Sequence, residues 1–140
     1  MRTPLRITWP NFAKRLSKAA LPDVDLVVAI ARGGLIPGAV LASKLEKPLL
    51  TVWLRMYEDG LAPVKKFSAP RLVAPFGASV AGKRILLVDD LARSGATLSR
   101  ARQLLPETKI TTFVVVGKAD VSLFPQHACV IFPWSNMQHL

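Results

Sequence analysis

The sequence is poor in cysteine and in acidic residues, and both shortages limit what the protein can be. Its 140 residues include one cysteine, Cys129, which cannot form an internal disulfide. A disulfide-stapled secreted scaffold is therefore excluded, and a reducing compartment is indicated. Nine acidic residues stand against nineteen basic ones, which gives a formal net charge of +10. A chain with this excess is expected to meet a polyanion, either nucleic acid or a small substrate with several phosphates.

A long hydrophobic run is also missing. The uncharged stretch 121–140 is interrupted by Pro125 and Pro133 and holds several polar side chains, whereas a bilayer span needs about 20 mostly apolar residues. The first residues, 1–4, lead into mixed polar sequence without the apolar core of a signal peptide. We therefore expect a soluble, cytoplasmic protein without integral membrane insertion.

The composition and the order of sequence patterns predict the fold class. With 51% hydrophobic and 20% charged residues, the chain can bury a sizeable core, and its length suits a single domain over residues 1–140. Strands are predicted at 26–30, 49–54, 85–88, 110–116 and 130–132, and helices at 8–20, 35–45 and 97–105. This alternation predicts an α/β, three-layer sandwich around a mostly parallel sheet. Such a sheet binds its ligands outside the carboxyl ends of its strands.

Between Arg55 and Gly82 the regular pattern dissolves, and prolines and glycines interrupt the chain. Structureless segments longer than roughly 12–15 residues are usually functional lids or linkers. We interpret residues 55–82 as a mobile lid that excludes water from a site.

Two adjacent carboxylates, Asp89 and Asp90, follow the predicted strand 85–88 directly. Because they repel one another, they make physical sense if they meet a cation or hydroxyl donors. The next residues, 93–97, open a predicted helix, where backbone N–H groups and the helix dipole favour an anion. One ligand that satisfies both features carries a vicinal diol, a metal-bound pyrophosphate and a terminal phosphate. The plainer alternative is a helix cap, made by Ser94 or Thr97, beside two solvated aspartates.

The stretch from Val88 to Thr97 resembles the phosphoribosyl-pyrophosphate (PRPP) signature of the type I phosphoribosyltransferases. Residues 29–38 are similar to the family's first loop, in which Arg32 offers a forked donor to phosphate and Gly33 and Gly34 permit close backbone approach. The resemblance implies that Asp89 and Asp90 are the catalytic pair that holds the ribose hydroxyls, that Asp90 helps to place Mg²⁺, and that Arg32 and Gly33 bind the pyrophosphate of PRPP. It further implies a loop that wraps the 5′-phosphate, made of Arg93, Ser94, Gly95, Ala96 and Thr97.

Within that family the chain most resembles the xanthine–guanine subgroup, through Ile7-Thr8-Trp9, Lys118 and Phe132-Pro133-Trp134. This likeness implies a transferase that joins the phosphoribosyl group of PRPP to a purine base, with a small C-terminal hood and a homo-oligomeric assembly. It also implies that Lys118 hydrogen-bonds the purine 6-oxo group and that backbone near Val130 meets the 2-substituent. A solvated lysine at a strand end is the plain alternative for Lys118.

Two positions depart from the subgroup. The 6-oxopurine members usually carry an aspartate where this chain has Arg93, and that aspartate is proposed to accept the purine N7 proton. An arginine cannot accept that proton at neutral pH. Three alternatives remain: water or another group removes the N7 proton, turnover is slow, or the acceptor is not a purine. The second departure is Cys129, which stands where the subgroup stacks an aromatic ring on the base. A shift of a few residues brings Phe132 or Trp134 there instead.

Other interpretations compete with the enzyme. A regulator that senses PRPP and binds nucleic acid is one alternative. The segment from Arg2 to Lys18 holds five basic residues and no acidic ones, which would suit contacts with phosphates.

Cys129 lies two residues from His127 without a nearby acid, so we expect a buried structural cysteine rather than a nucleophile. Trp9, Trp53 and Trp134 are expected to be core or interface anchors. The segment 77–83 matches a phosphate-loop pattern, but a strand is predicted after it where that motif needs a helix.

Overall fold

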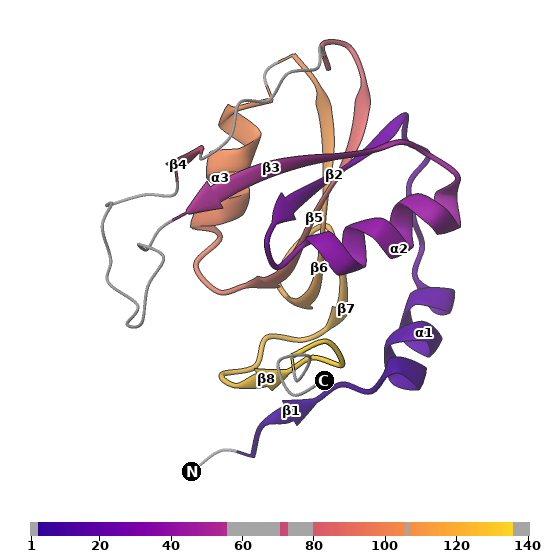
Figure 1. Ribbon diagram of the computed structural model, residues 1–140, viewed down its shortest axis with the longest axis vertical. Coiled ribbons are helices and arrows are strands. Elements are labelled where there is room, and N and C mark those ends of the chain that lie inside the picture. The colour runs from indigo at the N-terminus through magenta and orange to yellow at the C-terminus, as the bar shows by residue number, and fades with distance from the viewer. Residues whose placement is uncertain (1–2, 56–70, 73–79, 106, 136–140) are drawn as a thin grey trace.

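The computed structural model describes residues 3–55, 71–72, 80–105 and 107–135. Its main sheet has six strands in the order β4-β3-β2-β5-β6-β7 (Figure 1). The strands are β2 (Leu26–Ala31), β3 (Leu49–Arg55), β4 (Arg71–Leu72), β5 (Arg84–Ala92), β6 (Lys109–Gly117) and β7 (Val121–Phe124). All neighbouring pairs are parallel except β3 with β4, which is antiparallel. The predicted mostly parallel sheet is therefore confirmed.

In the described ranges, three helices cover this sheet: α1 (Trp9–Lys18), α2 (Leu35–Leu45) and α3 (Ala96–Gln103). Successive residues of β5 point to opposite faces, as expected for a strand. Leu86 and Val88 join the apolar cluster that includes residues of α1 and α2, whereas Ile85 and Leu87 join the cluster that includes residues of α3. The sheet thus has helices on both faces, which confirms the three-layer sandwich.

A second, two-stranded sheet forms the hood. It pairs β1 (Leu5–Arg6) with β8 (Val130–Ile131) in parallel, so the beginning and the end of the described chain lie together (Figure 1). The predicted strand at 130–132 therefore exists but belongs to this hood and not to the main sheet. The sequence did not predict β1 or β7. Both strands are short and lie next to polar residues, so neither forms a clear apolar run.

The helix starts follow local sequence. Thr8 is the N-cap of α1, and its side-chain oxygen accepts a hydrogen bond of 3.2 Å from the backbone N–H of Asn11, with Pro10 in the first turn. The start of α2 agrees with the prediction at Leu35, and α3 begins at Ala96, one residue before the predicted start. Within the described ranges, no helix has the length and apolar character needed to span a bilayer.

One strand boundary was wrong. The sequence placed the end of the strand at Val88, where apolar residues give way to charge, but β5 continues to Ala92. The neighbouring strand explains the extension, because the ladder with β6 continues as far as the pair Ala92–Gly117. A Cβ at Gly117 would overlap the carbonyl oxygen of Ala92, so only glycine permits this close approach. The acidic pair therefore lies inside a strand and not after it.

Most of the proposed lid, residues 55–82, lies outside the described residues. Its described part includes β4, which pairs Leu72 with Leu54 and Arg71 with Arg55 at the edge of the sheet. The interpretation of this segment as a mobile lid stays a prediction.

Candidate active site

The two sequence motifs meet at one edge of the sheet. β2 and β5 are adjacent parallel strands, so the loop after β2 and the acidic end of β5 lie at the same edge. A Cβ at Gly33 would come within 2.5–2.6 Å of the carboxyl atoms of Asp90, so that carboxyl group packs directly on the Gly33 backbone. Gly34 makes a similar contact one step further back, where a Cβ would overlap the carbonyl oxygen of Val88. The glycine pair thus lets the first loop rest on the end of β5.

Asp89 is buried, and Asp90 beside it is half-buried. Asp89 is 7% exposed, and its Oδ1 accepts a hydrogen bond of 2.8 Å from the backbone N–H of Asp90. Burial, with the charge of Asp90 beside it, raises the pKa of Asp89 well above its ordinary value. Burial also raises the pKa of Asp90. Two carboxyl groups in this position are poorly solvated as anions, so a cation or a set of hydroxyl donors would stabilise their charged forms.

The chain after the acidic pair turns directly into α3. Gly95 is the N-cap of α3 with a φ of 81°, a left-handed conformation that glycine adopts easily. The Ser94 Oγ accepts a hydrogen bond of 3.2 Å from the Ala96 N–H. Gly95 makes no side-chain cap, so neither Ser94 nor Thr97 is the helix N-cap of the plainer alternative. The first turn of α3 therefore presents backbone N–H groups without intrahelical acceptors.

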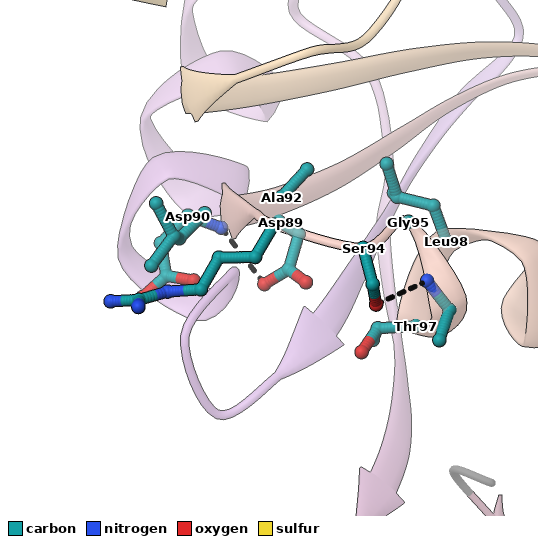
Figure 2. A pocket seen from close by; sticks show the side chains of 10 residues that line it. Asp89, Asp90, Ala92, Ser94, Gly95, Thr97 and Leu98 are labelled. Atoms are coloured by element: carbon teal, nitrogen blue, oxygen red, sulfur yellow. Dashed lines mark hydrogen bonds between the residues drawn. The ribbon is translucent and has the colours of Figure 1, made fainter. Parts of the chain in front are cut away.

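These elements enclose one cavity of about 280 Å³. Figure 2 shows the side-chain oxygens of Asp89, Asp90, Ser94 and Thr97 on the same side of the segment that joins β5 to α3. Ten consecutive residues line the cavity: Asp89, Asp90, Leu91, Ala92, Arg93, Ser94, Gly95, Ala96, Thr97 and Leu98. The structure thus brings together every predicted residue of the acidic pair and of the phosphate loop.

Leu91, Ala92 and Leu98 were not among the predicted site residues. Ala92 and Leu98 are buried in the apolar cluster on the α3 face and form the floor beneath the polar rim. An apolar residue is typical of the core, so residue type alone does not predict that these three line a cavity. Only their position between polar site residues in the sequence could have indicated it.

The donor set fits a magnesium ion. Mg²⁺ prefers oxygen ligands, takes one or two carboxylates from the protein and completes its shell with water and substrate phosphates. Asp89 and Asp90 supply such carboxylates. Because burial raises their pKa values, a positive charge beside them would stabilise their ionised forms. In the part of the chain that the structure describes, no group of three or more His, Cys, Asp or Glu side chains is arranged for a metal. The site therefore suits a metal that arrives with an anionic ligand better than a fully protein-bound ion.

Arg32 follows β2 directly, and its side chain lies toward β3. It is exposed at the end of β2, and its guanidinium carbon lies 5.9 Å from the centre of the Trp53 ring, over the ring face. The peptide bond between Ala31 and Arg32 is cis. Arg32 and Gly33 thus occupy the same edge of the sheet as the cavity, as the motif predicted.

The predicted base-binding residues come from two further elements. Lys118 is exposed directly after β6, the strand next to β5. The turn that holds it is fixed by Asp120, whose Oδ2 accepts hydrogen bonds from the N–H and the hydroxyl of Thr112, at 2.9 and 3.1 Å. Val130 belongs to β8 in the hood, outside the main sheet. Within the described part of the chain, the cavity around the acidic pair is lined by residues 89–98 and by neither Lys118 nor Val130.

The aromatic residues near the C-terminus are engaged with one another. Phe132 and Trp134 stack with ring centres 5.0 Å apart, and Trp134 also contacts Phe12 and Trp9. These rings form an anchor between the hood and α1, as expected for Trp9 and Trp134.

The expectation for Cys129 was wrong. Cys129 is exposed and not a buried structural residue, because it lies in the short hood segment before β8 and not in the main sheet. Its backbone N–H donates to the Nδ1 of His127 at 3.3 Å. The imidazole of His127 is thus engaged with the backbone of Cys129. The predicted strand after Lys83 is confirmed as β5, so the phosphate-loop pattern at 77–83 lacks its helix.

Comparisons with known proteins agree with this geometry. The model of the phosphoribosyl transferase domain family matches residues 11–133. A xanthine-guanine phosphoribosyltransferase of Nitratidesulfovibrio vulgaris is 31% identical over 142 residues, which cover 93% of this chain and 83% of the relative. The chain therefore belongs to the phosphoribosyl transferase family and is a transferase of that class.

Solved structures show the same fold. A purine phosphoribosyltransferase from Pyrococcus horikoshii has a TM-score of 0.73 at 23% identity, with 95% of each chain covered. The Helicobacter pylori xanthine-guanine-hypoxanthine phosphoribosyltransferase has a TM-score of 0.73 at 17% identity, covering 98% of this chain and 97% of that one. The predicted type I phosphoribosyltransferase-like fold is thus confirmed.

Proposed function

We propose that the protein transfers the 5-phosphoribosyl group of PRPP to a 6-oxopurine, namely guanine, xanthine or hypoxanthine, and releases pyrophosphate. In this reaction the bond from C1 of the ribose to pyrophosphate breaks, a bond from C1 to a purine ring nitrogen forms, and the purine loses one proton. The observation that carries the proposal is the meeting of three features at one sheet edge: the acidic pair Asp89–Asp90, the loop at Arg32–Gly33 and the amide-lined turn at 94–97.

The acidic pair acts on the sugar. Asp89 and Asp90 accept hydrogen bonds from the two ribose hydroxyls and hold C1 in place, and Asp90 takes part in placing Mg²⁺. Bound there, Mg²⁺ supplies positive charge to the pyrophosphate. As the bond at C1 breaks, positive charge develops on the sugar, and two carboxylates in a poorly solvated site stabilise that charge. The same burial that raises their pKa values in the free protein strengthens this interaction.

The phosphates are held on either side of the sugar. The 5′-phosphate accepts hydrogen bonds from the backbone of Gly95, Ala96 and Thr97 and from the hydroxyls of Ser94 and Thr97, at the N-terminus of α3. The pyrophosphate lies against the Gly33 backbone and pairs with the guanidinium of Arg32, which donates two parallel hydrogen bonds. Arg93 adds positive charge at the edge of the cavity.

The base is recognised by Lys118 and by the backbone near Val130. An ammonium group donates but does not accept hydrogen bonds, so Lys118 selects a 6-oxo group over a 6-amino group. The support for a 6-oxopurine is the 31% identical relative and the position of Lys118 after the strand next to β5. Arg93 cannot remove the purine proton, so water or another group takes it.

A panel of bases tests the proposal. We expect pyrophosphate release with PRPP, Mg²⁺ and at least one of guanine, xanthine and hypoxanthine, and little with adenine, uracil or orotate. Lys118→Ala should reduce the preference for 6-oxopurines over adenine, while PRPP binding persists. Release with orotate but with none of the purines would contradict the base assignment, and no release with any base would contradict the proposed activity.

A second candidate is a regulator that binds PRPP or a nucleotide without turnover and also binds nucleic acid. The net charge of +10 favours such a regulator, and so does Arg93, which stands where the subgroup carries a proton-accepting aspartate. Binding to a random duplex that weakens steeply with salt, together with no pyrophosphate release, would support this candidate over the enzyme.

Domain organisation, cellular compartment and assembly complete the proposal. We propose that residues 1–140 form one domain and that the protein works in the cytoplasm as a homodimer or homotetramer. The single cysteine is consistent with a reducing compartment. Light scattering in solution tests the assembly.

A further inference from the structure

The contact between Arg32 and Trp53 has no part in the functions proposed above. Trp53 lies in β3 and pairs with Ala31 of β2, the residue immediately before Arg32. The guanidinium carbon of Arg32 is 5.9 Å from the centre of the Trp53 ring and lies over its face. A cation within about 6 Å of an indole face is attracted by the negative charge of the ring face.

Trp53 is not a core side chain. Its neighbours in β3 with the opposite orientation, Val52 and Leu54, pack in the apolar cluster on the α3 face. Trp53 is half-buried and, among the described residues, belongs to neither apolar cluster. The prediction of an interface anchor stays a prediction, and the ring lies near the carboxyl end of its strand, beside the first loop.

An aromatic ring holds a guanidinium in a way that a carboxylate does not. A carboxylate partner would neutralise the charge of Arg32 and occupy its N–H donors. A ring face attracts the charge without accepting those N–H groups, which remain free for a second, anionic partner. The arrangement therefore keeps an exposed, flexible arginine in place while its charge and donors stay available.

We propose that Trp53 is a positioning residue for the pyrophosphate group, which acts by holding the Arg32 guanidinium at the carboxyl ends of β2 and β3, beside the first loop. This inference rests on the proposed function, because it assumes that Arg32 meets pyrophosphate. Trp53 itself contacts neither the sugar nor the base in this account. Its contribution is to reduce the conformational freedom that Arg32 loses when the anion binds.

Calorimetric titration with pyrophosphate in the presence of Mg²⁺ tests the inference. Trp53→Leu removes the ring face and should weaken pyrophosphate binding about two- to fivefold, the range expected for an exposed cation–π contact. Trp53→Phe keeps a ring and should recover most of the affinity. Trp9→Leu removes a partly exposed tryptophan of the anchor between α1 and the hood, away from the first loop, and should leave the pyrophosphate affinity unchanged.

A double-mutant cycle separates positioning from a general effect on the fold. In Arg32→Gln the cation is absent, so adding Trp53→Leu should weaken pyrophosphate binding by no further amount. In steady-state assays Trp53→Leu should raise the KM for PRPP and leave the KM for the base unchanged.

Three results would overturn the inference. These are equal losses in Trp53→Leu and Trp53→Phe, a Trp53→Leu effect that persists in Arg32→Gln, and unchanged affinity in Trp53→Leu when the unaltered protein binds pyrophosphate. Failure of the unaltered protein to bind pyrophosphate or PRPP would instead overturn the proposed function, and the inference with it.

Discussion

The carboxyl group of Asp90 lies directly on the backbone of Gly33, so close that a single methyl group at position 33 would come within 2.5–2.6 Å of its atoms. The two residues are 57 positions apart in the sequence, but Gly33 follows β2 and Asp90 lies in the adjacent parallel strand β5. This contact joins the first loop to the acidic pair, and it requires glycine because of space and not because of an unusual φ.

Gly33→Ala should therefore displace the Asp90 carboxyl group or the first loop. We expect PRPP affinity or kcat/KM to fall on the order of 100-fold, since small misplacements in a site have effects of that size. Circular dichroism should show an intact fold. Gly82→Ala is the control, because a Cβ there meets nothing within 4 Å although its φ is 77°. It should lose some stability and keep its ligand affinity, and an unaffected Gly33→Ala would contradict the contact.

The burial of the Asp89 carboxyl group beside Asp90 should lower the free energy of unfolding of the protein. Because the pKa of Asp89 is raised in the folded state, the folded protein binds more protons than the unfolded one above the ordinary carboxyl value, and stability falls as pH rises. Asp89→Asn should therefore raise Tm by about 3 °C or more at pH 8, and the gain should shrink toward pH 5 as the native carboxyl group protonates.

Asp25→Asn provides a control of opposite sign. Hydrogen bonds from Arg84 hold the pKa of Asp25 well below its usual range, so its charged form stabilises the folded state above the ordinary carboxyl value. This variant should lower Tm at both pH values. Scanning calorimetry at pH 5 and pH 8 measures both effects, and an Asp89→Asn variant that is less stable at both would contradict the electrostatic account.

The Thr97 hydroxyl should matter for phosphate and little for folding. Thr97→Val keeps the shape of the side chain but removes the donor, and we expect affinity for ribose 5-phosphate to fall about tenfold, the effect of one hydrogen bond to a charged group. Ser99→Ala, on the exposed side of α3, should have no effect. Equal affinities for all three proteins would place the phosphate elsewhere.

Arg93 should limit the rate with 6-oxopurines. Arg93→Asp introduces a proton acceptor, and general bases typically contribute 10²–10⁴-fold. We expect kcat with guanine or hypoxanthine, at saturating PRPP, to rise about tenfold or more above that of Arg93→Ala, which removes the charge without adding a base. A kcat for Arg93→Asp at or below that of Arg93→Ala would show that position 93 does not approach the purine proton.

The sequence predicted most of the main sheet because buried parallel strands are continuous apolar runs, as in residues 26–30 and 110–116. It also predicted the acidic pair and the phosphate loop, since these form one unbroken segment. It failed where long-range pairing decides the outcome. β5 continues past its apolar part because β6 continues beside it, and the two residues of β1 form a strand only because β8 is there to pair with them. The positions of Gly33 and Trp53 relative to their partners also required the sheet order.

The central claim is that Asp89, Asp90 and the turn behind them bind PRPP. Calorimetric titration of the protein with PRPP and Mg²⁺ tests it most directly, alongside the double variant Asp89→Asn/Asp90→Asn. We predict saturable binding by the unaltered protein and none by the double variant, which should still unfold cooperatively. No binding by the unaltered protein, or equal binding by both, would contradict the account.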